Sequence, residues 1–219
     1  MKAHIFVIED DAELAQSLKV LLTSAGAESV RCFESPTQFI KIYPDLSSTF
    51  QEQGCVLMDI RMPDMTGSEL FALMQSQNFP WPVIFMTGHG DLSMAVTLMK
   101  AGAFDYVTKP FDPMRLLEKV QAAMQLSNSR VADQVFKREH LARLLSLTHH
   151  ESQVFARILN NQTNREIAEV MENSVRTIET HRANILKKMG KSSALELAQI
   201  QERFKLLGGM TPFPMTQPH

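Results

Sequence analysis

The feature that most constrains the fold is an alternation of short apolar runs with helical patterns through the first 125 residues. Each run has the length of a strand and is followed by turn residues, then by leucines or methionines at helical spacing. This alternation predicts βαβ units, right-handed crossovers and a parallel sheet. The predicted strands are residues 4–8, 27–33, 55–58, 82–86 and 104–108.

Polar side chains follow these runs directly. Glu9 and Asp10 follow the first run, Asp59 the third and Thr87 the fourth, while Lys109 comes just after the fifth. The carboxyl ends of parallel strands meet at one edge of the sheet. We therefore expect these groups to converge, although up to 100 residues separate them in the chain.

Carboxylates that meet at one point repel one another, and it is costly to bury them unpaired. Raised pKa values or a cation must compensate, and oxygen ligands beside a phosphate oxygen suit Mg²⁺. With the metal, Asp59 is the predicted nucleophile and forms an acyl phosphate. Lys109 is the predicted charge partner of the phosphate, and Thr87 offers a hydroxyl donor. The bond between Lys109 and Pro110 is a candidate cis peptide.

Other polar residues near this edge have local structural interpretations. Asp11 is predicted to cap the first helix, and Asp64 to be a turn residue. The helix that follows Asp59 begins at either Thr66 or Ser68, since both are suitable N-caps.

The second part of the chain differs in pattern and in charge. Residues 1–125 hold 9 Lys and Arg against 15 Asp and Glu, whereas residues 126–219 hold 13 against 9. This asymmetry indicates two domains with different partners. The later pattern predicts helices only, at residues 148–159, 164–171, 174–189 and 193–206.

A short helix, a tight turn at Asn173 and Ser174, and a longer basic helix predict a helix-turn-helix. On the longer helix Ile178, Ile185 and Met189 form the predicted buried stripe. The opposite stripe is expected in the major groove, with Lys188 and Lys191 near phosphates. The alternative is a small helical dimerisation bundle with a solvated basic face. The groove-facing stripe consists of Arg176, Thr180, Ala183, Asn184 and Lys187.

Residues 3–125 resemble the receiver domain of two-component response regulators. The matching motifs are Glu9-Asp10, the segment from Asp59 to Gly67, Thr87-Gly88, Tyr106 and Lys109-Pro110. The resemblance implies phosphoryl transfer to Asp59 from a sensor histidine kinase. It also implies Mg²⁺ held by Glu9, Asp10, Asp59 and the backbone carbonyl of Arg61, with Glu9 in place of the more usual Asp. Thr87 and Tyr106 would be the switch pair.

About 55 residues from Leu147 onward resemble the DNA-binding domain of the LuxR family, through Leu147-Thr148, Glu151, Ile167-Ala168 and the segment from Ser174 to Met189. The resemblance places Glu179, Thr180 and Ala183 at base edges. With the receiver, the chain is similar to NarL/FixJ-type regulators, most of all the FixJ subgroup. The predicted DNA contacts are Arg176, Thr177, Glu179, Thr180, Ala183, Asn184, Lys187 and Lys188.

The expected fold is therefore α/β, a flavodoxin-like (βα)5 receiver with a parallel sheet, joined to a small all-α helix-turn-helix domain. The expected boundaries are residues 1–126 for the receiver, 127–145 for a partly helical linker, 146–207 for the DNA-binding domain and 208–219 for a disordered tail. The expected function is that of a DNA-binding transcriptional regulator activated by phosphorylation, and not that of an enzyme.

The expected partners are a sensor histidine kinase, double-stranded DNA and, after phosphorylation, a second copy of the chain; RNA polymerase is a further candidate. No apolar run is long enough to span a membrane, and the N-terminus lacks a signal-peptide pattern. Cys32 and Cys55 lie in strand-like runs and are expected to be reduced thiols. We therefore expect a cytoplasmic protein with no membrane partner.

Two alternatives belong to other functional classes. A Mg²⁺-dependent phosphatase could also form an aspartyl phosphate, but it usually needs a second acid two residues after the nucleophile. Arg61 occupies that position here, which disfavours the phosphatase. The other alternative is an interaction protein without a DNA site, which would fail to retard any DNA fragment at low salt.

Overall fold

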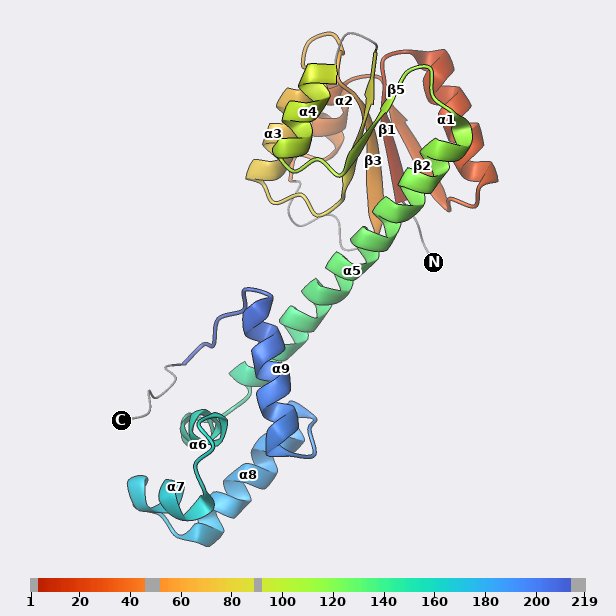
Figure 1. The fold of residues 1–219 in the computed structure, drawn as a ribbon. Coiled ribbons are helices and arrows are strands. Elements are labelled where there is room, and N and C mark those ends of the chain that lie inside the picture. Colours follow the sequence, from red (N-terminus) through yellow and green to blue (C-terminus); the bar gives the residue numbers. More distant parts are fainter. Residues whose placement is uncertain (1–3, 46–51, 89–91, 214–219) are drawn as a thin grey trace. The chain divides into compact units, whose positions relative to one another are not determined.

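The chain divides into two compact units, Met1–Ala132 and Asp133–His219, which meet within one helix. The structure is a computed structural model that describes residues 4–45, 52–88 and 92–213 (Figure 1). Within these residues no helix is both long enough and apolar enough to cross a membrane.

The first unit is built on a sheet of five parallel strands in the order β2-β1-β3-β4-β5. This is the flavodoxin-like order, and it confirms the predicted fold class. The strand order reverses between β1 and β3, which is the point where open α/β sheets bind ligands. The strands are β1 His4–Ile8, β2 Ser29–Phe33, β3 Gly54–Asp59, β4 Val83–Thr87 and β5 Asp105–Thr108.

The register of the strands aligns their carboxyl ends. Ile8 lies opposite Met58, so the next residues, Glu9 and Asp59, emerge side by side. Thr87 at the end of β4 lies opposite Thr108 at the end of β5, directly before Lys109. The predicted polar residues therefore lie at one edge of the sheet, as expected from the alternation of strands and helices.

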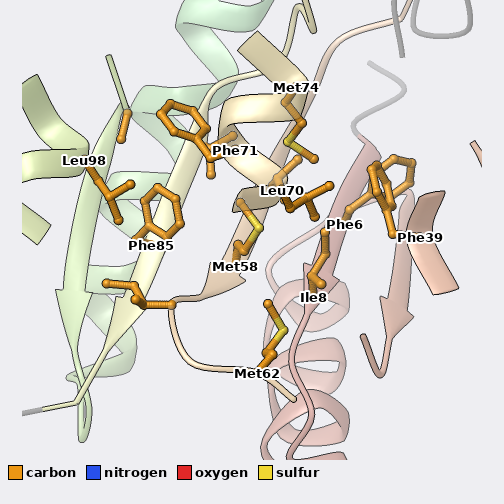
Figure 2. Close-up of a cluster of buried hydrophobic side chains, with 14 of the residues drawn as sticks. Phe6, Ile8, Phe39, Met58, Met62, Leu70, Phe71, Met74, Phe85 and Leu98 are labelled. Carbon is orange, nitrogen blue, oxygen red and sulfur yellow. The ribbon is translucent and has the colours of Figure 1, made fainter. Parts of the chain in front are cut away.

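Helices cover both faces of the sheet, and strand residues alternate between the two faces. Phe6, Met58 and Phe85 point to the face covered by α2, α3 and α4 (Figure 2). Val7 and Leu57 belong to the core on the opposite face, together with residues of α1 and α5. Figure 1 shows these two helices on that side of the sheet. The helices are α1 Ala12–Ser24, α2 Pro36–Ile42, α3 Gly67–Ser76, α4 Leu92–Lys100 and α5 Pro113–Leu145.

Side-chain caps fix where the helices near the sheet edge begin. Asp11 accepts from the amides of Glu13 and Leu14, which confirms it as the N-cap of α1. Thr66, not Ser68, caps α3, and it forms a capping box with Glu69. The loop that follows Asp59 thus ends at a defined residue, Thr66, seven positions further along the chain.

The second unit consists of helices. It contains the last part of α5 and four further helices. These are α6 His149–Leu159, α7 Asn164–Val170, α8 Val175–Met189 and α9 Ala194–Leu206. Their shared core buries Phe155, Ile167, Ile178 and Phe204, among others. Capping boxes at the starts of α6 and α7 and the Ser174 cap of α8 set the turns between these helices.

Two segments of the predicted domain organisation have the following structure. Residues 127–145, predicted as a partly helical linker, are helical throughout as the continuation of α5. Of the predicted disordered tail, residues 208–213 are described, and the ring of Phe213 lies edge-on to that of Phe155. Residues 214–219 of this tail lie outside the described residues.

Candidate functional site

Three carboxylates meet at the carboxyl edge of the sheet. One oxygen from each of Glu9, Asp10 and Asp59 lies within 4.8 Å of the others. Glu9 is 1% exposed and Asp59 is 9% exposed, whereas Asp10 is open to solvent. Since the donors are all carboxylate oxygens, this cluster is suited to a hard divalent cation.

Lys109 reaches into this cluster from the end of β5. Its Nζ donates to Oδ2 of Asp59 at 2.6 Å and to Oε2 of Glu9 at 2.7 Å. The other oxygen of Asp59, Oδ1, accepts from the backbone amide of Arg61 at 3.2 Å. The bond between Lys109 and Pro110 is cis, which confirms that prediction.

Burial and charge set the titration of this cluster. Burial raises the pKa of Glu9, the hydrogen bond from Lys109 lowers it, and the nearby Asp59 raises it, with a result of about 7. Burial acts to lower the pKa of Lys109, but its hydrogen bonds to Asp59 and Glu9 raise the pKa above its ordinary value. Lys109 is therefore a cation at neutral pH, and Glu9 is partly protonated.

The predicted switch residues lie on the two neighbouring strands. Thr87 ends β4 and is fully buried, and its hydroxyl oxygen has no hydrogen-bond partner among the described residues. A buried hydroxyl without a partner is unfavourable. An acceptor that reaches it in another state of the molecule would therefore favour that state. Tyr106 on β5 is half-buried and packs against the core cluster that contains Phe85 and Leu98.

In the second unit, α8 separates an apolar stripe from a polar one. Ile178, Ile185 and Met189 are fully buried, as predicted. The residues predicted to face the groove are exposed and lie on the other side of the same helix. The exposed set comprises Arg176, Glu179, Thr180, Ala183, Asn184 and Lys187, while Thr177 is half-buried.

Lys188 differs from the other predicted DNA contacts. Its Nζ donates to Oε2 of Glu151 at 2.6 Å and to the carbonyl of Ser146 at 2.9 Å. Glu151 is 4% exposed. Burial acts to raise the pKa of Glu151, but hydrogen bonds from Lys188 and Thr148 hold it below the ordinary range. The lysine is thus engaged inside the domain, and its contact with DNA stays a prediction.

Arg143 was given no role by the sequence, because it lies in the segment predicted as a linker. Its Nη1 donates to the carbonyl of Met189, the last residue of α8, at 2.7 Å. No spacing rule connects these residues, which lie 46 positions apart in the chain.

Family models match both units. The response regulator receiver domain matches residues 5–121, and the LuxR family of bacterial regulatory proteins matches residues 145–201. The transcriptional regulatory protein FixJ of Bradyrhizobium diazoefficiens is 38% identical over 206 residues, which cover 94% of this chain and 98% of the relative. The response regulator protein TodT of Pseudomonas putida is 34% identical over 201 residues, covering 92% and 86%.

Solved structures give the same result. The response regulator StyR superimposes with a TM-score of 0.82 at 31% identity, covering 93% of this chain and 100% of that one. Full-length FixJ from B. japonicum superimposes with a TM-score of 0.57 at 37% identity, covering 94% and 98%. The matches are to transcriptional response regulators, and they favour that function over the phosphatase alternative. The chain therefore belongs to the family of transcriptional response regulators that join a two-component receiver to a LuxR-type DNA-binding domain.

Proposed function

We propose that Asp59 accepts a phosphoryl group from a sensor histidine kinase and that this modification controls DNA binding by α8. The observation that supports the proposal most is the convergence of Glu9, Asp10, Asp59 and Lys109 at the switch point of the sheet. A receiver domain implies a kinase partner, and a LuxR-type domain implies DNA binding.

We assign a Mg²⁺ site to Glu9, Asp10, Asp59 and the backbone carbonyl of Arg61. The fit is good, because three carboxylates meet there with a single described ammonium group, that of Lys109, among them. Burial is the main cause of the raised pKa of Glu9, and the nearby charge of Asp59 raises it further. When bound, Mg²⁺ would supply the charge neutralisation that lets an anionic phosphate donor approach the carboxylates.

The transfer forms a bond between an oxygen of Asp59 and phosphorus, while the bond from phosphorus to the donor nitrogen breaks. The bonding electron pair leaves with the nitrogen of the donor histidine. Lys109 already contacts Oδ2 of Asp59 and remains protonated, so its ammonium group can stabilise a phosphoryl oxygen. The Arg61 amide holds Oδ1 and fixes the orientation of the carboxylate.

The phosphoryl group then supplies the acceptor that the Thr87 hydroxyl lacks. Movement of Thr87 toward this group leaves space behind it on the side of β5, and we assign that space to the ring of Tyr106. Two observations support this coupling: the Thr87 hydroxyl has no partner within residues 4–45, 52–88 and 92–213, and the ring of Tyr106 is half-buried. The result is a shift in population between two receiver surfaces.

In the second unit we assign the groove-facing role to the exposed stripe of α8. Arg176 and Lys187 supply charge to phosphates, and Thr180, Ala183 and Asn184 are small or polar groups suited to base edges. Glu179 can accept from the amino group of a cytosine. One small module makes few phosphate contacts, so we propose that two phosphorylated chains bind adjacent half-sites as a dimer.

The assignment of Asp59 is tested by labelling with acetyl phosphate and Mg²⁺. We expect one phosphoryl group per wild-type chain and none on Asp59→Asn, while Asp10→Asn should keep the acceptor and lose most of the rate. The variant Asp64→Asn is the matched control, because Asp64 is an exposed turn residue at positive φ near the site. Stoichiometric labelling of Asp59→Asn would refute the assignment.

A further inference from the structure

The C-terminal end of α8 is held by residues at the junction of α5 and α6. Arg143, in the last turn of α5, donates from Nη1 to the carbonyl of Met189 at 2.7 Å. Met189 is the last residue of α8, and the final carbonyls of a helix have no partner within the helix. The charge of Arg143 also lies at the negative end of the α8 dipole, which makes the contact more favourable.

The residue after Met189 leaves room for this contact. Gly190 has a φ of 63° and caps α8 in the left-handed conformation. A Cβ atom at Gly190 would lie 2.5 Å from Nη1 of Arg143. Glycine at this position therefore serves two purposes, the backbone turn and the close approach of the guanidinium.

A second contact reaches the same turn of α8 from the same junction. Lys188 donates to the carbonyl of Ser146 at 2.9 Å and to Glu151 at 2.6 Å. Glu151 is itself fixed, since its Oε2 accepts from the amide of Thr148 at 2.7 Å in the capping box of α6. The last turn of α8 is thus held from two sides. Its Met189 carbonyl accepts a hydrogen bond from Arg143, and its Lys188 side chain donates hydrogen bonds to Ser146 and Glu151.

We propose that Arg143 is a positioning residue for DNA recognition, which fixes the end of α8 through Met189 and so sets how the exposed stripe meets the groove. This proposal rests on the proposed DNA-binding role of α8. The proposal also gives the last turns of α5 a role in DNA binding. Leu144, in the same turns, is buried in the core of the DNA-binding unit. Arg143 acts through the helix and does not itself contact DNA.

The test uses the full-length chain and two duplexes, the one most enriched from a random pool and a scrambled version of it. Arg143→Ala should weaken binding to the enriched duplex about tenfold, the loss expected for one charge-assisted hydrogen bond. Binding to the scrambled duplex and the slope of affinity against salt should stay unchanged, because the number of phosphate contacts is the same. Arg143→Lys, which keeps the charge and a donor, should restore part of the loss.

Hydrogen exchange supplies the structural readout. The amides of Gly190 and Lys191 bond back to the carbonyls of Lys187 and Leu186. In Arg143→Ala these two amides should exchange faster, while the core of the unit keeps its protection. Arg138→Ala is the matched control, because it removes the same charge from an exposed position on the same helix.

Three results would overturn the proposal: unchanged affinity in Arg143→Ala, an equal loss in Arg138→Ala, or a salt slope reduced by about 1, which indicates a direct phosphate contact. If Arg143→Ala does not fold, Arg143→Lys tests the proposal instead. In that variant the amides of Gly190 and Lys191 must exchange faster and the affinity for the enriched duplex must fall, and the proposal is wrong if either stays unchanged. Failure of the underlying function is distinct, since a wild-type chain that enriches no duplex would already show it.

Discussion

Glu9 is the most deeply buried of the three acids at the edge of the sheet. It is 1% exposed, and burial together with the charge of Asp59 outweighs Lys109 and raises its pKa from 4.5 to about 7. The folded state therefore holds a proton that the unfolded state releases between these two values. Without metal, the free energy of unfolding should fall as the pH rises from about 4.5 to about 7.

The affinity for Mg²⁺ should depend on the same titration of Glu9, but it should increase as the pH rises. Mg²⁺ requires the ionised carboxylate, so its affinity should be about tenfold weaker at pH 6 than at pH 8. Calorimetric titration of the wild-type chain with Mg²⁺ measures this directly. In Glu9→Gln the affinity should be weaker at both pH values and nearly independent of pH. An equally strong pH dependence in that variant would show that another group titrates.

Thr87 provides a second test at the scale of one side chain. Thr87→Val removes a buried hydroxyl for which the described part of the chain offers no partner, and it keeps the shape of the side chain. The free energy of unfolding should therefore not fall, and it should rise by up to about 1 kcal/mol. Labelling at Asp59 should persist, while the effect of phosphorylation on DNA affinity should be lost. A destabilised variant with an intact response would contradict the role given to this hydroxyl.

At the scale of the element, α8 places two adjacent lysines in different environments. Lys187 is exposed on the proposed groove face, whereas Lys188 is paired with the buried Glu151. The sequence pattern does not separate them, since both are charged residues in the last turn of a basic helix. The distinction depends on Glu151, which lies 37 residues away.

Exchanging each lysine for methionine separates the two roles. Lys188→Met leaves Glu151 buried and unpaired, so it should cost about 1–3 kcal/mol of the free energy of unfolding. Lys187→Met should change that free energy by less than about 0.5 kcal/mol, as expected at an exposed site. It should instead weaken DNA binding and reduce the salt slope by about 1. Denaturation and binding at several salt concentrations check both variants, and reversed effects would contradict the assignment.

Local signals allowed most elements to be predicted from the sequence, because their causes are local. The period of the apolar residues gave the strands and helices, and the predicted cap Asp11 gave the start of α1. The convergence of Glu9, Asp59 and Lys109 could also be predicted, since parallel strands share one edge. What could not be predicted depends on side chains distant in sequence, such as the contact of Arg143 with Met189.

At the scale of the whole molecule, the chain couples an acidic receiver to a basic DNA-binding unit. Residues 1–125 have a formal net charge of −6 and residues 126–219 one of +4. The family assignment accounts for both halves, with one model matching each unit. The boundary between the two units falls within α5, whose first part belongs to the receiver and whose last turn carries Arg143.

The most direct test is the affinity for the enriched duplex, measured with and without acetyl phosphate and Mg²⁺, for wild type and Asp59→Asn. We predict that phosphorylation tightens binding by wild type at least tenfold, with two chains per duplex, while the variant stays at the unphosphorylated affinity. Asp64→Asn should respond like wild type. An equal response in Asp59→Asn, or none in a fully labelled wild type, would contradict control of DNA binding through Asp59.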